Sequence, residues 1–482
     1  MVDLRPVGYV IGLLVAVLGA AMLLPLLADL AEGRGHWPAF AQSGLITVLA
    51  GVTLALSCAN GVGQGLTIQQ TFLLTTGVWL TLPIFGALPF IFGATEADFT
   101  DAFFEAMSGL TTTGATVLSG LDQLPAGILL WRGILQWLGG IGIIVVAMVF
   151  LPELRVGGMQ IFRSEGFDTF GKILPRATEI ASRISVVYVA LTMICALAYM
   201  STGLDPFDAT VHAMTTIATG GFANYDASFA AFGPSTEYVA ALFMLLAALP
   251  FVRFVQLSTG TARPLLLDPQ IRGFFGTALV IVALVATWNL TQQNGEGEEA
   301  VRKALFNAVS LLTGTGYASA DYMVWGSFAI TVLFFAGLIG GCAGSTACSI
   351  KIFRYQLLIA SIRAQLQKTR SPHGIFTPRY AGRAVGDDVL SSVMSFFMFF
   401  TVTLGALAVA LGLTGLDFTT SVSGAAAALA NIGPGLGDII GPAGNYAPLN
   451  DTAKWLLSMA MLIGRLELLA VYAILTIQFW RA

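Results

Sequence analysis

The sequence predicts an all-α polytopic membrane protein in which four membrane–pore–membrane repeats surround a central pore, preceded by an N-terminal helix pair. Of its 482 residues, 56% are hydrophobic and 10% are charged, whereas a soluble domain carries about 25% charged residues. The mean hydropathy of +0.81 likewise excludes a soluble protein. Four times, a short turn rich in Thr or Gly follows an amphipathic stretch. Lipid tolerates such irregular backbone only where it lines a cavity or is buried in protein.

Ten apolar segments are expected to cross the membrane, because a spanning helix needs about 20 apolar residues. They cover residues 8–30, 40–62, 70–93, 124–151, 181–201, 236–258, 273–291, 325–350, 389–412 and 454–479. The first two form the N-terminal pair within residues 1–65. The other eight divide into repeats over residues 66–165, 166–265, 266–380 and 381–482, each with a pore loop between its two spans.

The four turns align on one glycine each, which indicates internal duplication. These glycines are Gly114, Gly221, Gly316 and Gly433. Eight positions earlier, each repeat has an alanine: Ala106, Ala213, Ala308 and Ala425. Sixteen positions earlier, the residues are Asp98, Asp205, Ala300 and Asp417. An acid where a short helix begins and a small residue where helices crowd are physically reasonable columns for a repeated pore helix.

The turns themselves are the candidate ion-binding segments. A ring of backbone carbonyls replaces the hydration shell of a monovalent cation, and glycine permits the backbone angles that point successive carbonyls inward. Threonine adds a hydroxyl ligand or braces the turn, and the C-terminal end of each preceding helix favours a cation. The expected selectivity-filter residues are Thr112, Thr113, Gly114, Thr219, Gly220, Gly221, Gly314, Thr315, Gly316, Asn431, Ile432 and Gly433.

The acids around the pore helices have two readings. Asp98, Asp101, Asp205, Asp208 and Asp417 either cap helix N-termini or form an outer ring that concentrates cations. Capping is the favoured main role. Glu105, inside the first pore helix, is expected to brace that helix rather than bind the ion. His212, on the second pore helix, is expected to be a packing residue.

The eighth and tenth spans carry candidate gating residues. The run Gly340-Gly341-Cys342-Ala343-Gly344-Ser345-Thr346 is too flexible to remain helical, and is expected to form a gate beneath the filter. Its gating residues are Gly340, Gly341, Gly344, Ser345 and Thr346. Arg465, an expensive charge within the membrane, is expected to meet carbonyls of this loop and to hinder cations. The alternatives are a glycine-mediated helix crossing for the loop and a structural anchor for Arg465.

Charge distribution predicts the orientation in the membrane. Most Lys and Arg residues fall at the N-terminus and in the loops around 152–180, 259–272 and 351–388. The positive-inside rule therefore places these loops and both termini in the cytoplasm. The pore loops then enter from outside.

Other classes of protein fit poorly. The sequence contains no phosphate loop with its lysine, no dinucleotide fingerprint and no catalytic triad, so the chain is not expected to be an enzyme. Its four cysteines lack metal-ligand spacing and are expected to pack in the membrane. No nucleic-acid partner is expected. An alternating-access transporter of an organic solute would have two inverted repeats, whereas the four turns run in the same orientation.

These features together resemble the Trk/Ktr/HKT superfamily of potassium transporters, most closely its TrkH-type bacterial branch, over essentially the whole chain. The motifs that carry the resemblance are residues 111–116, 218–222, 313–317, 431–437, 131–132, 137–140, 340–351 and 464–467. Each motif is weak alone, but their combination and order are specific.

The resemblance implies potassium uptake across the bacterial inner membrane, with K+ held at the filter residues and no cofactor in this chain. It also implies a homodimer with one pore per subunit and a cytoplasmic, TrkA-like regulatory partner of the RCK type. That partner, not this chain, would bind NAD(H) or ATP/ADP and gate the pore. Channel-like flux is favoured, and a sodium- or proton-coupled symporter is the alternative.

Two departures from the family pattern stand out. Cys348-Ser349 occupy positions where two glycines are usual, which predicts a stiffer gate. Asn431-Ile432 replace threonine in the fourth filter, so the ring is not expected to be fourfold in its ligand chemistry.

Overall fold

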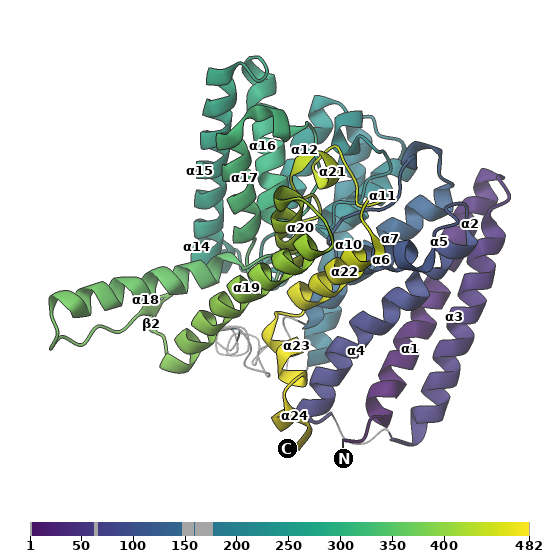
Figure 1. Ribbon diagram of the computed structural model, residues 1–482, viewed down its shortest axis with the longest axis horizontal. Coiled ribbons are helices and arrows are strands. Elements are labelled where there is room, and N and C mark those ends of the chain that lie inside the picture. The colour runs from purple at the N-terminus through teal and green to yellow at the C-terminus, as the bar shows by residue number, and fades with distance from the viewer. Residues whose placement is uncertain (1, 62–65, 147–158, 160–176, 482) are drawn as a thin grey trace.

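The computed structural model describes residues 2–61, 66–146, 159 and 177–481 and consists mostly of helices (Figure 1). The expected cytoplasmic loop around 152–180 lies almost wholly outside the described residues. A two-residue pair of antiparallel strands, β1 (Arg379–Tyr380) and β2 (Arg383–Ala384), is the only sheet among the described residues. The predicted all-α architecture is confirmed.

The N-terminal pair consists of a span formed by α1 (Arg5–Ala21) and α2 (Leu23–Glu32), followed by α3 (Trp37–Cys58). Helices α1 and α3 pack closely because glycines face backbone: a Cβ on Gly12 or Gly51 would collide with the opposite helix. The pair lies at one side of the molecule in Figure 1, against α4 and α7.

Each following repeat contains a first span, a short pore helix and a second segment after the turn. The first spans are α4–α5 (Ile68–Gly86 and Leu88–Phe92), α10 (Ala177–Ser201), α15 (Pro269–Gln292) and α19 (Asp387–Leu413). The pore helices are α6 (Phe99–Leu110), α11 (Pro206–Ile217), α16 (Gly297–Thr313) and α20 (Phe418–Ala430). The second segments begin with α7 (Ala126–Val145), α12 (Pro234–Ala247), α17 (Ser327–Ile339) and α22 (Asp451–Arg465).

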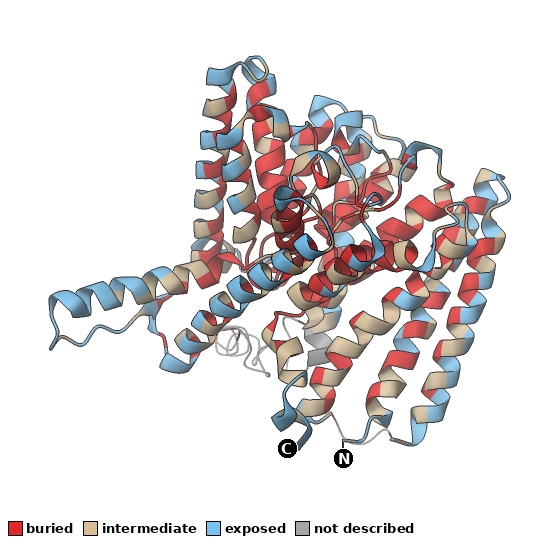
Figure 2. Ribbon diagram, in the orientation of Figure 1, coloured by how far each residue is buried: buried red, intermediate tan, exposed pale blue. Residues whose placement is uncertain are grey.

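The repeats close into a ring. The second segment of each repeat packs on the pore helix of the next: α7 on α11, α12 on α16, α17 on α20, and α22 on α6 of the first repeat. This cyclic packing places the four pore helices around one centre. Figure 2 shows that centre as the main concentration of buried residues.

Three of the ten expected spans are not continuous helices. In the second repeat, α12 and α13 (Phe251–Ser258) meet at a 90° bend. In the third, α17 ends at Ile339 and an irregular loop leads to α18 (Ile352–Arg370). In the fourth, α22 ends at Arg465 and α23 (Leu469–Ile474) follows. The described residues therefore contain seven helices long and apolar enough to span, or eight when the bent pair is included.

Two short helices connect these elements, α14 (Arg263–Leu267) and α21 (Gly437–Ile440), and α24 (Ile477–Arg481) follows α23 as the last described helix. Exposed apolar side chains cover the outer helices; the most apolar stretch of α19, for example, is only 17% buried. Such a surface suits lipid, which solvates apolar side chains. Helix α18 projects from the body in Figure 1.

Candidate functional site

Aspartates cap three of the four pore helices, as the sequence predicted. Asp98 accepts a hydrogen bond from the backbone N–H of Asp101 (2.8 Å), Asp205 from Phe207 (2.9 Å), and Asp417 from Thr420 (3.1 Å). Hydrogen bonds from the side chain and backbone of Thr420 lower the pKa of the exposed Asp417 carboxyl. In the third repeat, Glu296 stands at the N-cap position but its side chain makes no capping bond.

The opposite ends of the pore helices share one hydrogen-bond pattern. In every repeat, the residue just before the key glycine donates its backbone N–H to the carbonyl of the residue five positions earlier, and the N···O distance is 2.9 Å each time. The four bonds are Thr113 to Ser108, Gly220 to Thr215, Thr315 to Ser310 and Ile432 to Ala427. The turns thus have the same backbone geometry although their side chains differ.

The backbone angles of the turns also repeat. The residue two before each key glycine has a positive φ: 51° at Thr112, 48° at Thr219, 72° at Gly314 and 52° at Asn431. The key glycines themselves have φ between 80° and 101°. Positive φ is a strained conformation for a β-branched residue. The two threonines are therefore held in place by the surrounding packing.

Each key glycine lies against a carbonyl oxygen of the neighbouring turn. A Cβ on Gly114 would meet the oxygen of Gly220, on Gly221 that of Thr315, on Gly316 that of Ile432, and on Gly433 that of Thr113. All four separations would be under 3.0 Å, closer than real Cβ atoms approach other atoms. The contacts run around the ring and return to the first turn. The structure therefore brings all twelve predicted filter residues into one closed ring of backbone.

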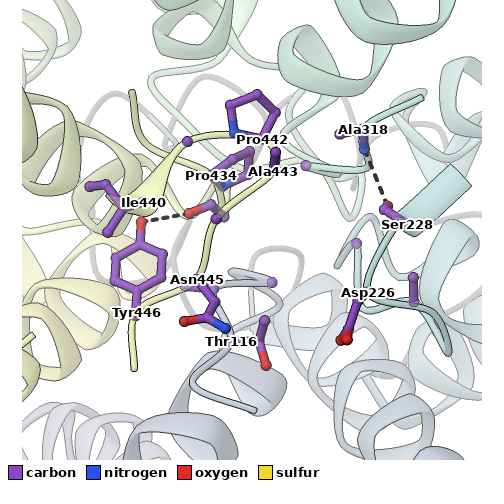
Figure 3. Close-up of a pocket in the computed structure, with 18 of the residues that line it drawn as sticks. Thr116, Asp226, Ser228, Ala318, Pro434, Ile440, Pro442, Ala443, Asn445 and Tyr446 are labelled. Atoms are coloured by element: carbon purple, nitrogen blue, oxygen red, sulfur yellow. Dashed lines mark hydrogen bonds between the residues drawn. The ribbon is translucent and has the colours of Figure 1, made fainter. Parts of the chain in front are cut away.

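All four key glycines line one cavity of about 470 Å³. Figure 3 shows residues of several repeats around it, among them Thr116, Asp226, Ala318 and Pro434. The cavity wall is held by hydrogen bonds, including one from the Tyr446 hydroxyl to the Gly433 carbonyl (2.7 Å). The cavity is therefore a vestibule with the glycine ring at its base.

Buried polar side chains support the ring from behind, and the sequence analysis did not predict them. Gln136 on α7 donates to the Gly220 carbonyl (2.6 Å) and accepts from the Phe222 N–H (3.0 Å), which clamps the turn on both sides of Gly221. Tyr317 in the third repeat bonds Thr215 in the second (2.5 Å). An intramembrane glutamine on an otherwise apolar helix was the available signal.

Glu105 braces more than its own helix. Its carboxylate accepts from Arg132 Nε (2.8 Å), from the Thr116 hydroxyl (3.0 Å) and from the Val117 N–H (2.9 Å). Arg132 also donates to the Ala223 carbonyl (2.6 Å). Both charged side chains are almost fully buried. This pair ties the segment after the first turn to the segment after the second.

His212 is a packing residue, as expected. Its Nδ1 lies 2.8 Å from the Asp208 carbonyl and its ring packs edge-on against Phe229 and Phe232. Asp208 in turn accepts from Asn224 (2.7 Å) and Tyr225 (2.6 Å). Asp101 pairs with Lys454 on α22 (2.5 Å).

The loop after α17 is buried and fills the breaks in neighbouring helices. Cys342 N–H donates to the Ala248 carbonyl (3.0 Å), and Phe251 N–H donates to the Gly344 carbonyl (2.9 Å). The Thr346 hydroxyl donates to the Ala247 carbonyl (3.1 Å). Backbone groups that the bend between α12 and α13 leaves free are thus satisfied by the loop. Gly340, Gly341, Gly344, Ser345 and Thr346 all belong to this buried segment.

Arg465 reaches this loop from the end of α22. Its Nη1 lies 3.4 Å from the Thr346 carbonyl and 2.6 Å from Cys348 Sγ. Glu467 does not neutralise it, since that carboxylate pairs with Lys351 (3.2 Å) and Arg354. The contact with a loop carbonyl was predicted; the nearer contact, with a thiol, was not.

Comparison with known proteins identifies the family of this chain. The model of the TrkH family, described as cation transport proteins, matches residues 36–479. The chain belongs to this family. Among its TrkH-family relatives, the Trk system potassium uptake protein TrkI of Halomonas elongata is 44% identical over 99% of this chain and 97% of its own. TrkH of Escherichia coli K12 is 36% identical over 99% of both chains.

A solved structure of the family also matches. The crystal structure of the potassium transporter TrkH from Vibrio parahaemolyticus superposes with a TM-score of 0.91, at 33% identity, over 100% of both chains. The predicted family resemblance and fold are confirmed, and the chain is a transport protein rather than an enzyme.

Proposed function

We propose that this chain takes up potassium across the bacterial inner membrane by conducting K+ through the ring of four turns. The observation that carries the proposal is the closed ring itself, in which every key glycine faces a carbonyl of the next turn. Backbone carbonyls in such a ring replace the hydration shell of K+. The names of the TrkH and TrkI relatives, which describe potassium uptake proteins, support the same ion.

Within this proposal, the filter is formed by the carbonyls and threonine hydroxyls of residues 112–114, 219–221, 314–316 and 431–433. The pore helices direct their C-terminal, partly negative ends at the ring, which favours a cation there. The vestibule opens to the outside, and both termini are cytoplasmic. The basic residues in the loops around 259–272 and 351–388 support this orientation.

The loop Gly340–Thr346 and Arg465 form the gate in this proposal. They lie on the side of the ring away from the vestibule, and Arg465 contributes a positive charge without a carboxylate partner among the described residues. A positive charge beside a pore opposes cations. An RCK-type, TrkA-like partner on the cytoplasmic face would open the gate with its own NAD(H) or ATP/ADP, and two copies of this chain would form the homodimer.

Flux through proteoliposomes tests the proposal. The purified chain alone is reconstituted, and uptake of K+, Rb+, Na+ and Li+ is compared without a sodium or proton gradient. Fast uptake that favours K+ and Rb+ supports channel-like flux through the filter. Uptake that requires an imposed sodium or proton gradient contradicts channel-like flux and supports symport. Equal uptake of all four ions contradicts the filter assignment.

A further inference from the structure

Cys348 lies against the ring, close to two of its four turns. Its Sγ is 3.6 Å from the hydroxyl of Thr112, in the first turn. Its Cβ would lie 3.3 Å from a Cβ on Gly314, in the third turn. The first and third turns are opposite each other, because the glycine contacts run from first to second to third to fourth. A side chain in contact with two opposite turns sits between them, at the centre.

The same thiol is the nearest acceptor of Arg465. The separation of 2.6 Å from Nη1 to Sγ is shorter than the 3.4 Å to the Thr346 carbonyl. Arg465 is 4% exposed. Among the described residues, neither its Nε nor its Nη2 has a hydrogen-bond partner. The thiol is therefore the nearer of the two acceptors that contact this buried guanidinium, which also lies 6.0 Å from the centre of the Trp79 ring.

The backbone around Cys348 holds the thiol in place. The Ser349 N–H donates to the Ala430 carbonyl at the end of α20 (3.0 Å), and its hydroxyl donates to the Gly337 carbonyl of α17 (2.5 Å). Ser349 has a φ of 69°, a conformation that side chains disfavour. These bonds anchor the loop to the third and fourth repeats and leave the Cys348 side chain directed at the turns.

We propose that Cys348 is a positioning residue of the gate: its thiol, on the pore axis, holds the Arg465 guanidinium directly beneath the filter. The inference rests on the proposed function, because it assumes that cations pass through the ring. It adds a specific closing contact to that function. An uncompensated positive charge fixed on the axis raises the barrier to cation passage, and loss of its acceptor releases the charge toward other carbonyls of the loop.

The test compares variants at this position by Rb+ uptake into proteoliposomes. Cys348→Ala keeps the Cβ but removes the acceptor, and is expected to raise uptake about fivefold, the size of change expected for loss of one hydrogen bond of ordinary net strength. Cys348→Ser retains an acceptor and is expected to remain near the wild-type rate. Cys195→Ala is the control for loss of a thiol as such, because it removes a buried thiol on α10, in the second repeat.

A double variant decides whether the thiol acts through Arg465. If it does, Cys348→Ala combined with Arg465→Ala takes up Rb+ no faster than Arg465→Ala alone. Equal uptake by wild type and a folded Cys348→Ala protein overturns the proposal, as does a further increase in the double variant. Should Cys348→Ala not fold, Cys348→Gly, which also removes the acceptor, answers the same question. Selectivity separates this inference from the proposed function. If the wild-type protein shows no preference for K+ over Na+, the filter assignment is contradicted, whatever the uptake rates of the variants.

Discussion

The ring of four turns repeats one geometry, whereas the layer directly beneath it differs in every repeat. In the ring, the hydrogen bonds, the positive φ angles and the glycine contacts recur at equivalent positions. Beneath it, α7 continues to Val145, α12 bends by 90° into α13, α17 gives way to a loop, and α22 ends at Arg465. The comparison separates two tasks: a uniform ring suits coordination of one ion, and an asymmetric layer suits a gate.

The two layers differ in the residues on which their structure depends. In the ring, each key glycine meets a carbonyl of the next turn, so the contacts between turns depend on the absence of a side chain at these four positions. The layer beneath depends on particular side chains, above all Arg465, Cys348 and Ser349. Substitutions in the ring are therefore expected to change selectivity, and substitutions beneath it to change the rate.

Breaking the ring should have the largest effect. Gly221→Ala places a Cβ against the Thr315 carbonyl at a separation that real atoms do not reach, at a residue whose φ is 80°. The third turn must move, and we expect selective K+ uptake to be abolished. Proteoliposome flux of K+ against Na+ measures this. Gly233→Ala, in the same repeat, meets no atom within 4 Å and is the matched control. Unchanged K+ preference in Gly221→Ala would remove the ring from the pathway.

The pair Glu105–Arg132 tests what holds the ring in register. Arg132→Met leaves the Glu105 carboxylate buried and without its cation, which typically costs about 3–5 kcal/mol. We expect a large drop in the melting temperature of the detergent-solubilised protein. In the double variant Glu105→Leu/Arg132→Met no charge is left unpaired, so much of the stability should return. A single variant as stable as wild type would mean that the pair does not support the ring.

Beneath the ring, Arg465→Ala should raise the rate without changing selectivity. Removal of a buried positive charge lowers the barrier to cations; a tenfold faster flux corresponds to ~1.4 kcal/mol, and we expect an increase of about that size. Rb+ uptake measures the rate, and the K+/Na+ ratio measures selectivity. Poor folding without faster uptake would instead support a purely structural anchor.

Removal of several residues from Gly340–Thr346 should also speed the passage of cations, whereas a folded but inactive deletion variant would argue against a gate.

The sequence predicts the ring better than the layer beneath it, for a physical reason. Positive φ and close backbone contact require glycine, so the columns of Gly114 and its counterparts are visible in the sequence, as are the capping aspartates. The braces are not visible in this way. Glu105 and Arg132 lie on different helices of the first repeat and meet only when these helices pack together. Arg132 and Ala223, or Cys348 and Thr112, belong to different repeats and meet only through the packing of those repeats.

The helix breaks were only partly predictable. Gly340-Gly341 signalled the end of α17, because paired glycines disfavour a helix. Pro250 lies in the bend between α12 and α13, but a single proline in an apolar run also occurs in spanning helices, as Pro83 does in α4. The sequence therefore does not predict the break within 236–258, and residues 454–479 contain no proline to signal theirs. Satisfaction of the broken backbone by the loop around Gly344 depends on tertiary contacts.

The smallest expected effect distinguishes the capping role of the acids at the pore helices from attraction of cations. Asp417→Ala removes the hydrogen bond to the Thr420 N–H and should cost about 1 kcal/mol of stability. Because the pKa of Asp417 is lowered in the folded protein, the contribution of the charged cap is complete at neutral pH. It is lost only as the pH falls below the ordinary value of 3.8 and through the folded-state pKa. Thermal unfolding at neutral pH measures the cost.

Two further variants make this comparison sharp. Asp417→Asn keeps a good cap but removes the charge, so a pure capping role predicts wild-type stability and wild-type K+ uptake. Glu296→Ala, in the repeat whose N-cap side chain makes no capping bond, should leave stability unchanged. If Asp417→Asn instead lowers K+ uptake at low ionic strength, and high salt removes the difference, the carboxylate attracts cations to the vestibule, because salt screens exposed charges. The outer ring would then contribute an electrostatic function that its hydrogen bonds alone do not reveal.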